Sequence, residues 1–220
     1  MNTFNVAEKF VSINGEGLRA GELAVFIRFC GCNLNCSYCD TRWANENSVI
    51  VTPMTADEIY AYIKSTEIKN VTLTGGEPLI QPGIEELLDI LGSDRDLHVE
   101  IETNGSIPIK KFKADNFTFT IDCKLPSSGM YGSFDISNIH QTASKDTLKF
   151  VVGDNDDLKI AADMVLSYNL VSRINVFISP VFGEIDPAEI VEFMKTNKLN
   201  GVKLQLQLHK LIWNPETRGV

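Results

Sequence analysis

Seven short runs of aliphatic, β-branched and aromatic residues recur along the chain and are separated by more polar segments. The runs are LAVFIRF (23–29), NVTLT (70–74), LHVEIET (97–103), FTFTIDC (117–123), TLKFVV (147–152), INVFISP (174–180) and VKLQLQL (202–208). Several are apolar nearly throughout, which is typical of strands that are covered on both faces. The pattern therefore predicts a sheet whose strands lie largely inside the protein.

Four of the intervening segments have the periodicity of amphipathic helices. These segments are 55–67, 81–93, 154–169 and 186–198. Thr55 with Glu58 three residues later forms a capping box, and Asp186 stands before a proline as an N-cap residue does. The alternation of strands and helices indicates βα units on a largely parallel sheet with right-handed crossovers.

Seven strands and only four clear helices do not fit a complete eightfold barrel, and an open barrel fits better. We therefore predict an α/β fold, an incomplete TIM-like βα barrel with a largely parallel sheet. Because the chain contains no repeat, low-complexity tract or linker, we expect residues 1–220 to form a single domain. The Gly- and Ser-rich segment 124–146 is expected to be a loop over the sheet.

The composition narrows the possible partners. A net charge of −9 and the lack of a Lys/Arg run argue against nucleic acid or a membrane as a partner, because both require a basic surface. The N-terminus lacks the basic and apolar regions of a signal peptide, and no apolar stretch approaches the ~20 residues that span a bilayer. We expect a cytoplasmic, reducing location, which disfavours disulfide bonds.

Four of the five cysteines fall in the segment CGCNLNCSYCDTRW (30–43). A zinc site usually takes four ligands, often as two C-x2-C pairs, but only Cys36 and Cys39 form such a pair and the three histidines are scattered. Cys30 is expected to lie in the preceding strand and to point away. Three thiolates on a four-iron cluster would leave one iron without a protein ligand, and that iron could chelate a substrate or cofactor. The loop therefore favours a reactive iron–sulfur site.

The segment CNLNCSYC, with Tyr38 before its last cysteine, resembles the C-x3-C-x2-C loop of the radical S-adenosylmethionine (SAM) superfamily. The resemblance implies that Cys32, Cys36 and Cys39 hold one 4Fe–4S cluster whose fourth iron is chelated by SAM. It also implies that electron transfer cleaves SAM to a 5′-deoxyadenosyl radical. Because the radical forms on SAM, no side chain is assigned a catalytic role.

Further motifs lie at the carboxyl ends of the predicted strands, where βα folds place their chemistry. LTGGEP (73–78) looks like the GGE motif of the superfamily, and EIETNG, IDCK and ISPVFG end later strands. The SAM-binding residues implied by the resemblance are Gly75, Gly76, Glu77, Glu102, Asn104, Asp122, Cys123, Lys124, Ser179, Pro180, Val181 and Phe182. The cysteines outside the loop of three, Cys30 and Cys123, are expected to be buried thiols and not cluster ligands.

The whole chain resembles the 7-carboxy-7-deazaguanine synthase family, most strongly in SINGEG (12–17) and FIRFCGCNLNCSYCDT. The resemblance implies conversion of 6-carboxy-5,6,7,8-tetrahydropterin to 7-carboxy-7-deazaguanine with loss of ammonia, in queuosine or deazapurine biosynthesis. It also implies a homodimer and an electron donor such as flavodoxin or ferredoxin.

The same resemblance assigns the remaining site residues. Thr41 is the expected Mg²⁺ ligand, and Arg28 is expected to pair with the substrate carboxylate. The substrate-binding residues are then Ile13, Asn14, Gly15, Glu16, Arg28 and Thr74. At position 14 the family more often has Gln, so a main-chain contact is the firmer expectation there. His209, Lys210 and the C-terminal tail are expected near the site, and Asp40 is expected to be a structural turn residue.

Two other functions share parts of this pattern. An enzyme that installs a glycyl radical on a partner protein would have the same cysteine loop, with an open face for a peptide. A non-enzymatic iron–sulfur or zinc module would have a closed site with four ligands.

Overall fold

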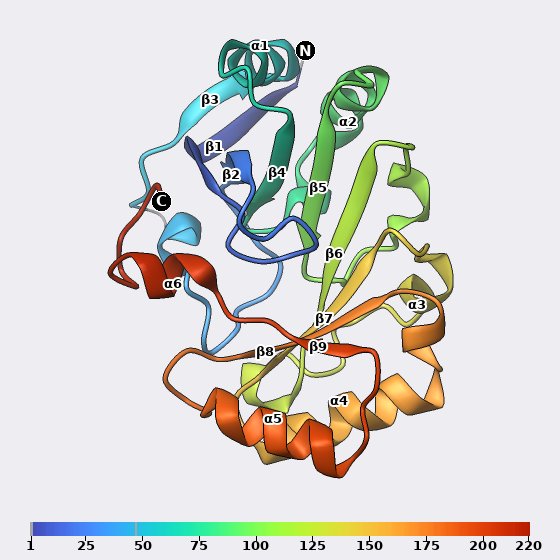
Figure 1. Cartoon of the computed structure of the whole chain (residues 1–220). Helices are drawn as coiled ribbons and strands as arrows, with labels where there is room; N and C mark the ends of the chain where they lie inside the picture. Colours follow the sequence, from blue (N-terminus) through green and yellow to red (C-terminus); the bar gives the residue numbers. More distant parts are fainter. Residues whose placement is uncertain (1, 47) are drawn as a thin grey trace.

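Within residues 2–46 and 48–220, which the computed structural model describes, nine strands form one sheet in the order β3-β1-β2-β4-β5-β6-β7-β8-β9 (Figure 1). The strands are β1 (Thr3–Ile13), β2 (Leu23–Phe29), β3 (Thr52–Thr55), β4 (Asn70–Gly75), β5 (His98–Thr103), β6 (Phe117–Cys123), β7 (Thr147–Val152), β8 (Asn175–Pro180) and β9 (Val202–Leu204). Neighbouring strands from β2 to β9 are parallel, whereas β1 is antiparallel to β2 and β3. The sheet does not close, so the predicted open α/β barrel is confirmed.

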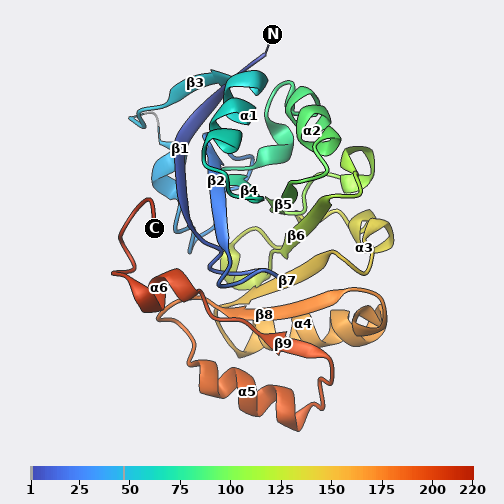
Figure 2. The ribbon, with the colours of Figure 1, turned by 45° about the horizontal axis from the view of Figure 1, so that its top comes forward.

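The four predicted helices are present as α1 (Ala56–Ser65), α2 (Ile84–Ser93), α4 (Asn155–Ser167) and α5 (Pro187–Thr196). Figures 1 and 2 show them on the outer side of the curved sheet. The capping box is formed, because Thr55 Oγ1 accepts from the amide of Glu58 and the Glu58 carboxylate accepts from the amide of Thr55. Asp186 caps α5 by accepting from the amide of Ala188.

Two short helices were not predicted, α3 (Ser137–Gln141) and α6 (Leu208–Ile212). The predicted strand 202–208 is wrong beyond Leu204. After Gln205 the backbone leaves the sheet and crosses to the N-terminal loop, where the amide of Leu208 donates to the carbonyl of Gly15 at 3.0 Å. No helix within the described residues has the length and apolar character that a membrane span requires.

The strands present two chemically different faces. Their outer face is apolar and packs on the helices, with Ile27, Leu73 and Ile121 fully buried in the core. The inner face carries polar and charged side chains at the alternate positions, including Arg28, Asp122 and Lys149. Because side chains alternate along a strand, each buried strand contributes both to the core and to a polar inner surface.

A loop near the N-terminus and a segment near the C-terminus meet over this inner surface. The loop 14–22 between β1 and β2 is held by Gln205, whose Oε1 accepts from the amide of Gly17 at 3.0 Å and whose Nε2 donates to its carbonyl at 3.0 Å. These two bonds join residues that are 188 positions apart, and both are buried. Gln205 therefore fixes the loop against the end of β9.

Replacing Gln205 with Ala should loosen the loop 14–22. It leaves two buried main-chain groups of Gly17 without partners, which costs about 2 kcal/mol. Amide hydrogen exchange in the loop should then be at least about tenfold faster, as measured by mass spectrometry. Lys203→Ala, at an exposed position on β9 two residues before Gln205, is the matched control. Equal protection of the loop in wild type and Gln205→Ala would contradict this role.

Candidate active site

The cysteine loop begins where β2 ends and is packed against the end of β4. The amide of Gly76 donates to the carbonyl of Phe29 at 2.9 Å, and the amide of Glu77 donates to the carbonyl of Gly31 at 2.8 Å. A Cβ atom at Gly76 would lie 1.8 Å from the carbonyl oxygen of Gly31, so no larger residue fits without displacing backbone. The GGE segment is therefore the support on which the cysteine loop rests.

The Glu77 side chain has an internal role. It is fully buried and accepts from the amides of Leu79 at 3.0 Å and Asn104 at 2.7 Å and from the hydroxyl of Thr103 at 2.8 Å. Of the predicted SAM-binding residues, Glu77 thus has its carboxylate turned into the protein. It ties the ends of β4 and β5 together.

The three predicted cluster ligands lie close enough for their charges to interact. Burial is the main cause that raises the pKa of Cys36, and the neighbouring Cys39 and Cys32 raise it further. Burial also raises the pKa of Cys32, with a smaller contribution from Cys39. Within the described residues, no three Cys, His, Asp or Glu side chains are grouped as ligands of one metal ion.

The other two cysteines differ from each other in position and burial. Cys123 is buried as predicted, with its sulfur 3.8 Å from Met164 Sδ of α4, and burial raises its pKa to about 12. Its thiol is on the helix side of the sheet, so at this position only main-chain atoms face the site. Cys30 is half-buried, and the expectation that it is a buried thiol is wrong, because β2 ends at Phe29 and Cys30 already belongs to the loop.

Neighbouring segments hold the cysteine loop in place. Arg42 Nη2 donates to the carbonyls of Cys36 at 2.7 Å and Ser37 at 3.1 Å. Asn104 Nδ2, at the end of β5, lies 2.9 Å from Asn33 Oδ1 and 3.6 Å from Cys32 Sγ. Arg42 was not singled out from the sequence, since nothing in its spacing marks it as a main-chain anchor.

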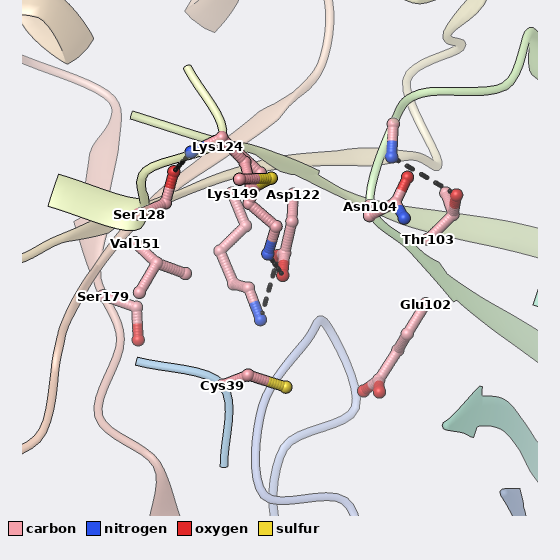
Figure 3. A network of polar contacts seen from close by, with 12 residues as sticks. Cys39, Glu102, Thr103, Asn104, Asp122, Lys124, Ser128, Lys149, Val151 and Ser179 are labelled. Atoms are coloured by element: carbon pink, nitrogen blue, oxygen red, sulfur yellow. Dashed lines mark hydrogen bonds and ion pairs between the residues drawn. The ribbon is translucent and has the colours of Figure 1, made fainter. Parts of the chain in front are cut away.

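A chain of largely buried ion pairs crosses the inner face beside this loop (Figure 3). Lys149 Nζ lies 3.1 Å from Asp122 Oδ1 and 3.2 Å from Glu16 Oε2, and Lys124 Nζ lies 3.0 Å from Asp122 Oδ2. Burial opposes ionisation of Asp122, but the charges of Lys124 and Lys149 together hold its pKa below its usual value. Ser179 Oγ donates to Glu16 Oε1 at 3.1 Å.

The structure therefore brings the predicted residues Glu16, Asp122, Lys124 and Ser179 together around Lys149, which was not predicted. The signal for Lys149 was present in the sequence. A lysine inside the apolar run TLKFVV must face a partner if the strand is buried.

Arg28 and Thr74 occupy the neighbouring part of the inner face and lie opposite each other on paired strands. Arg28 Nε donates to Glu8 Oε2 at 3.1 Å, and Thr74 Oγ1 donates to Glu102 Oε2 at 2.6 Å. Burial raises the pKa of Glu102. Thr41, beyond the cysteine loop, has its hydroxyl 3.6 Å from Cys39 Sγ.

The predicted substrate loop is engaged within the protein. Asn14 is buried, its side-chain oxygen accepts from Thr72 Oγ1 at 2.8 Å, and its main-chain amide and carbonyl bond Glu22 and Gly21. Gly15 packs on His209, whose Nδ1 would lie 2.4 Å from a Cβ at this position. Ile13 ends β1. The main-chain amide of Asn14 is thus engaged, whereas its carbonyl oxygen has a second lone pair with which it could accept a bond from a ligand.

Pro180, Val181 and Phe182, which follow Ser179, line a cavity of about 360 Å³ together with Leu206 and Leu211. The cavity lies between the end of β8 and α6, and its walls are mainly apolar. The C-terminal segment folds towards the cysteine loop, since Lys210 Nζ is 3.2 Å from Asp40 Oδ2 and the Arg218 guanidinium lies 4.0 Å from the centre of the Trp43 ring. Asp40 thus anchors the tail, which agrees with a structural role.

A second polar layer lies beneath this site. Thr120 Oγ1 donates to Glu100 Oε1 at 2.6 Å, and Gly17 covers the same carboxyl group from the loop above. Burial and then the charge of Glu102 raise the pKa of Glu100 to about 7. Glu100 was not predicted as a site residue, because only its burial distinguishes it from a carboxylate on an exposed strand face.

The chain is similar to several known proteins. The model of the radical SAM superfamily matches residues 26–124. A 7-carboxy-7-deazaguanine synthase of Clostridium acetobutylicum is 58% identical over 221 residues, covering 99% of each chain. Another, of Chlorobaculum tepidum, is 37% identical and covers 98% of this chain and 97% of its own. The crystal structure of QueE from Escherichia coli shares the fold, with a TM-score of 0.73 at 21% identity over 93% of this chain and 94% of that one.

Replacing Glu100 with Gln should reduce the pH dependence of stability. The pKa of Glu100 is about 7 in the folded protein and 4.5 for an ordinary Glu carboxyl. Protonation of Glu100 therefore stabilises the fold, and this stabilisation is fully present below pH 4.5. This contribution, on the order of 3 kcal/mol at most, is lost as the pH rises through about 7. Urea unfolding between about pH 5 and pH 8 should therefore show a smaller loss for Glu100→Gln than for wild type. Glu192→Gln, at an exposed position, is the control, and parallel pH profiles for wild type and Glu100→Gln would refute the assignment.

Proposed function

The chain belongs to the 7-carboxy-7-deazaguanine synthase family, radical SAM enzymes of deazapurine biosynthesis, and we propose that it converts 6-carboxy-5,6,7,8-tetrahydropterin to 7-carboxy-7-deazaguanine with release of ammonia. The observation that carries this proposal is the position of Arg28. Its guanidinium lies on the same polar inner face as Thr74 and Glu16, beside the loop of three cysteines. An arginine in such a place suits a ligand that bears a carboxylate.

Cys32, Cys36 and Cys39 would hold one 4Fe–4S cluster, and the cluster when bound supplies the electron that cleaves SAM. Gly75 and Gly76 would offer main-chain groups to SAM, and Glu102, Asn104, Asp122, Lys124 and Ser179 would offer side chains. Pro180, Val181 and Phe182 would receive an apolar part of SAM at the cavity that they line. Glu77 and Cys123 would contribute only through their main chain, because their side chains are engaged elsewhere.

For the substrate, Arg28 would bind the carboxylate while Thr74 and Glu16 orient the pterin. Glu16 is already held by Lys149 and Ser179, so it presents its charge in a fixed position. Thr41 would be a ligand of Mg²⁺, which is often held by few protein groups together with oxygens of the substrate. The C-terminal segment, fixed by Asp40 and Trp43, would help to exclude water from the site.

The remaining parts of the proposal follow from the family and the composition. The enzyme would act in the cytoplasm as a homodimer and receive electrons from a donor such as flavodoxin or ferredoxin. Its acidic composition supports a small-molecule substrate and neither nucleic acid nor a membrane as a partner.

The test is an anaerobic assay of the reconstituted, reduced enzyme with SAM, Mg²⁺ and 6-carboxy-5,6,7,8-tetrahydropterin. We expect 7-carboxy-7-deazaguanine and one equivalent of ammonia, identified by mass spectrometry and an ammonia assay. SAM cleavage without a deazaguanine product would sink the proposed reaction and would favour a glycyl-radical activating enzyme. An EPR spectrum of the reduced cluster that SAM leaves unchanged would favour a non-enzymatic iron–sulfur module.

Each of the substitutions Cys32→Ala, Cys36→Ala and Cys39→Ala should abolish SAM cleavage. Each should also lower the iron content of the anaerobically reconstituted protein. Cys30→Ala and Cys123→Ala are the matched controls and should retain both. If Cys30→Ala lost its cluster, three-cysteine ligation would be wrong.

A further inference from the structure

Strand β1 contains a β-bulge that changes which of its side chains reach the inner face. Val6 lies opposite Phe29 of β2, but Glu8 lies opposite Arg28, so one extra residue of β1 is accommodated between the two pairs. In a regular ladder Ala7 would face Arg28 and Glu8 would face Ile27 on the apolar outer side. The bulge therefore moves Glu8 from the core side of the sheet to the site.

Glu8 then contacts one atom of the Arg28 guanidinium. Its Oε2 accepts from Nε at 3.1 Å, and the two side chains are only 19% and 16% exposed. Among residues 2–46 and 48–220, no side chain other than Glu8 bonds this guanidinium, and its two Nη groups donate to no protein atom there. Glu8 thus contacts the Nε side of the guanidinium and leaves both Nη groups available.

This arrangement limits how Arg28 binds an anion. A guanidinium binds a carboxylate in two parallel hydrogen bonds, either through Nε and one Nη or through both Nη groups. With Nε occupied by Glu8, the second mode remains. We propose that Glu8 is a positioning residue that directs both Nη groups of Arg28 at the carboxylate of the substrate. This inference rests on the proposed function, in which Arg28 binds that carboxylate.

Glu8 also accounts for the burial of Arg28. A cation in this position is costly without a partner, and its side chain would otherwise move to reach solvent or another anion. Glu8 neutralises the charge of Arg28 and leaves the two Nη groups available to a ligand. Loss of Glu8 should therefore reduce affinity for the carboxylate and leave affinity for the pterin ring unchanged.

The test compares two unreactive ligands, 6-carboxypterin and pterin, which differ in the carboxylate. Their affinities for the reconstituted enzyme with SAM are measured by ligand fluorescence for wild type, Glu8→Ala and Glu8→Gln. We expect Glu8→Ala to bind 6-carboxypterin about tenfold more weakly and pterin equally well, as one lost oriented interaction implies. Glu8→Gln should stay within about threefold of wild type for both, because its amide oxygen still accepts from Nε. In turnover, Glu8→Ala should raise KM with little change in kcat.

Other outcomes would overturn the proposal. Equal weakening of both ligands would mean that Glu8 only supports the fold, and tighter binding of 6-carboxypterin by Glu8→Ala would mean that Glu8 competes with the ligand. If Glu8→Ala does not fold, Glu8→Asp carries the test, because a side chain shorter by one methylene should weaken 6-carboxypterin alone. If these variants bind 6-carboxypterin and pterin with the same ratio of affinities as wild type, the role of Glu8 is rejected. If wild type still forms the deazaguanine product, the proposed function stands.

Discussion

The ammonium group of Lys149 joins three parts of the chain that are remote in sequence. It lies on β7, pairs with Asp122 at the end of β6, and pairs with Glu16 in the loop 14–22, which is 133 residues away along the chain. Burial disfavours its charge, but Asp122 and Glu16 hold the pKa of Lys149 above its usual value. Removing one member of such a network leaves an unpaired buried charge, which costs about 3–5 kcal/mol. The position of the N-terminal loop over the sheet therefore depends on this lysine.

The inner face of this open barrel is polar, unlike the interior of a closed barrel. A closed barrel fills its interior with apolar side chains in layers, whereas here the inward positions include Arg28, Glu102 and Asp122. The main apolar core lies on the outer side, between the strands and the helices. The fold is thus stabilised on one face of the sheet, and the other face is available for charged groups and their ligands. Because side chains alternate along each strand, the residues that pack in the core and the residues that line the site lie on opposite faces of the sheet.

Features that depend on local sequence were predictable. The strands with apolar outward positions, the caps at Thr55 and Asp186, and the cysteine loop all follow from residues that are near one another in the chain. Features that depend on pairing across the sheet were not. The bulge interrupts the alternation of β1, so this strand had no regular pattern, and the partner of Gln205 is 188 residues away. Glu77 resembled a ligand-binding residue because its motif is specific, but only the structure shows its carboxylate bonding to the ends of other strands.

The inner face carries more acidic than basic side chains. Carboxylates outnumber cations there: Glu8, Glu16, Glu100, Glu102 and Asp122 face Arg28, Lys124 and Lys149. Burial and mutual repulsion favour the protonated forms of Glu100 and Glu102, whose pKa values are raised, because the cations are already committed to the other three acids. With both protonated, the other three acids balance the three cations, and an anionic substrate would bring an uncompensated negative charge. It follows that a carboxylate would bind most favourably when a cation enters the site with it, and the proposed Mg²⁺ and the sulfonium of SAM each supply one. This uncompensated charge gives a physical reason for binding of substrate and cofactors to be coupled, independent of any contact between them.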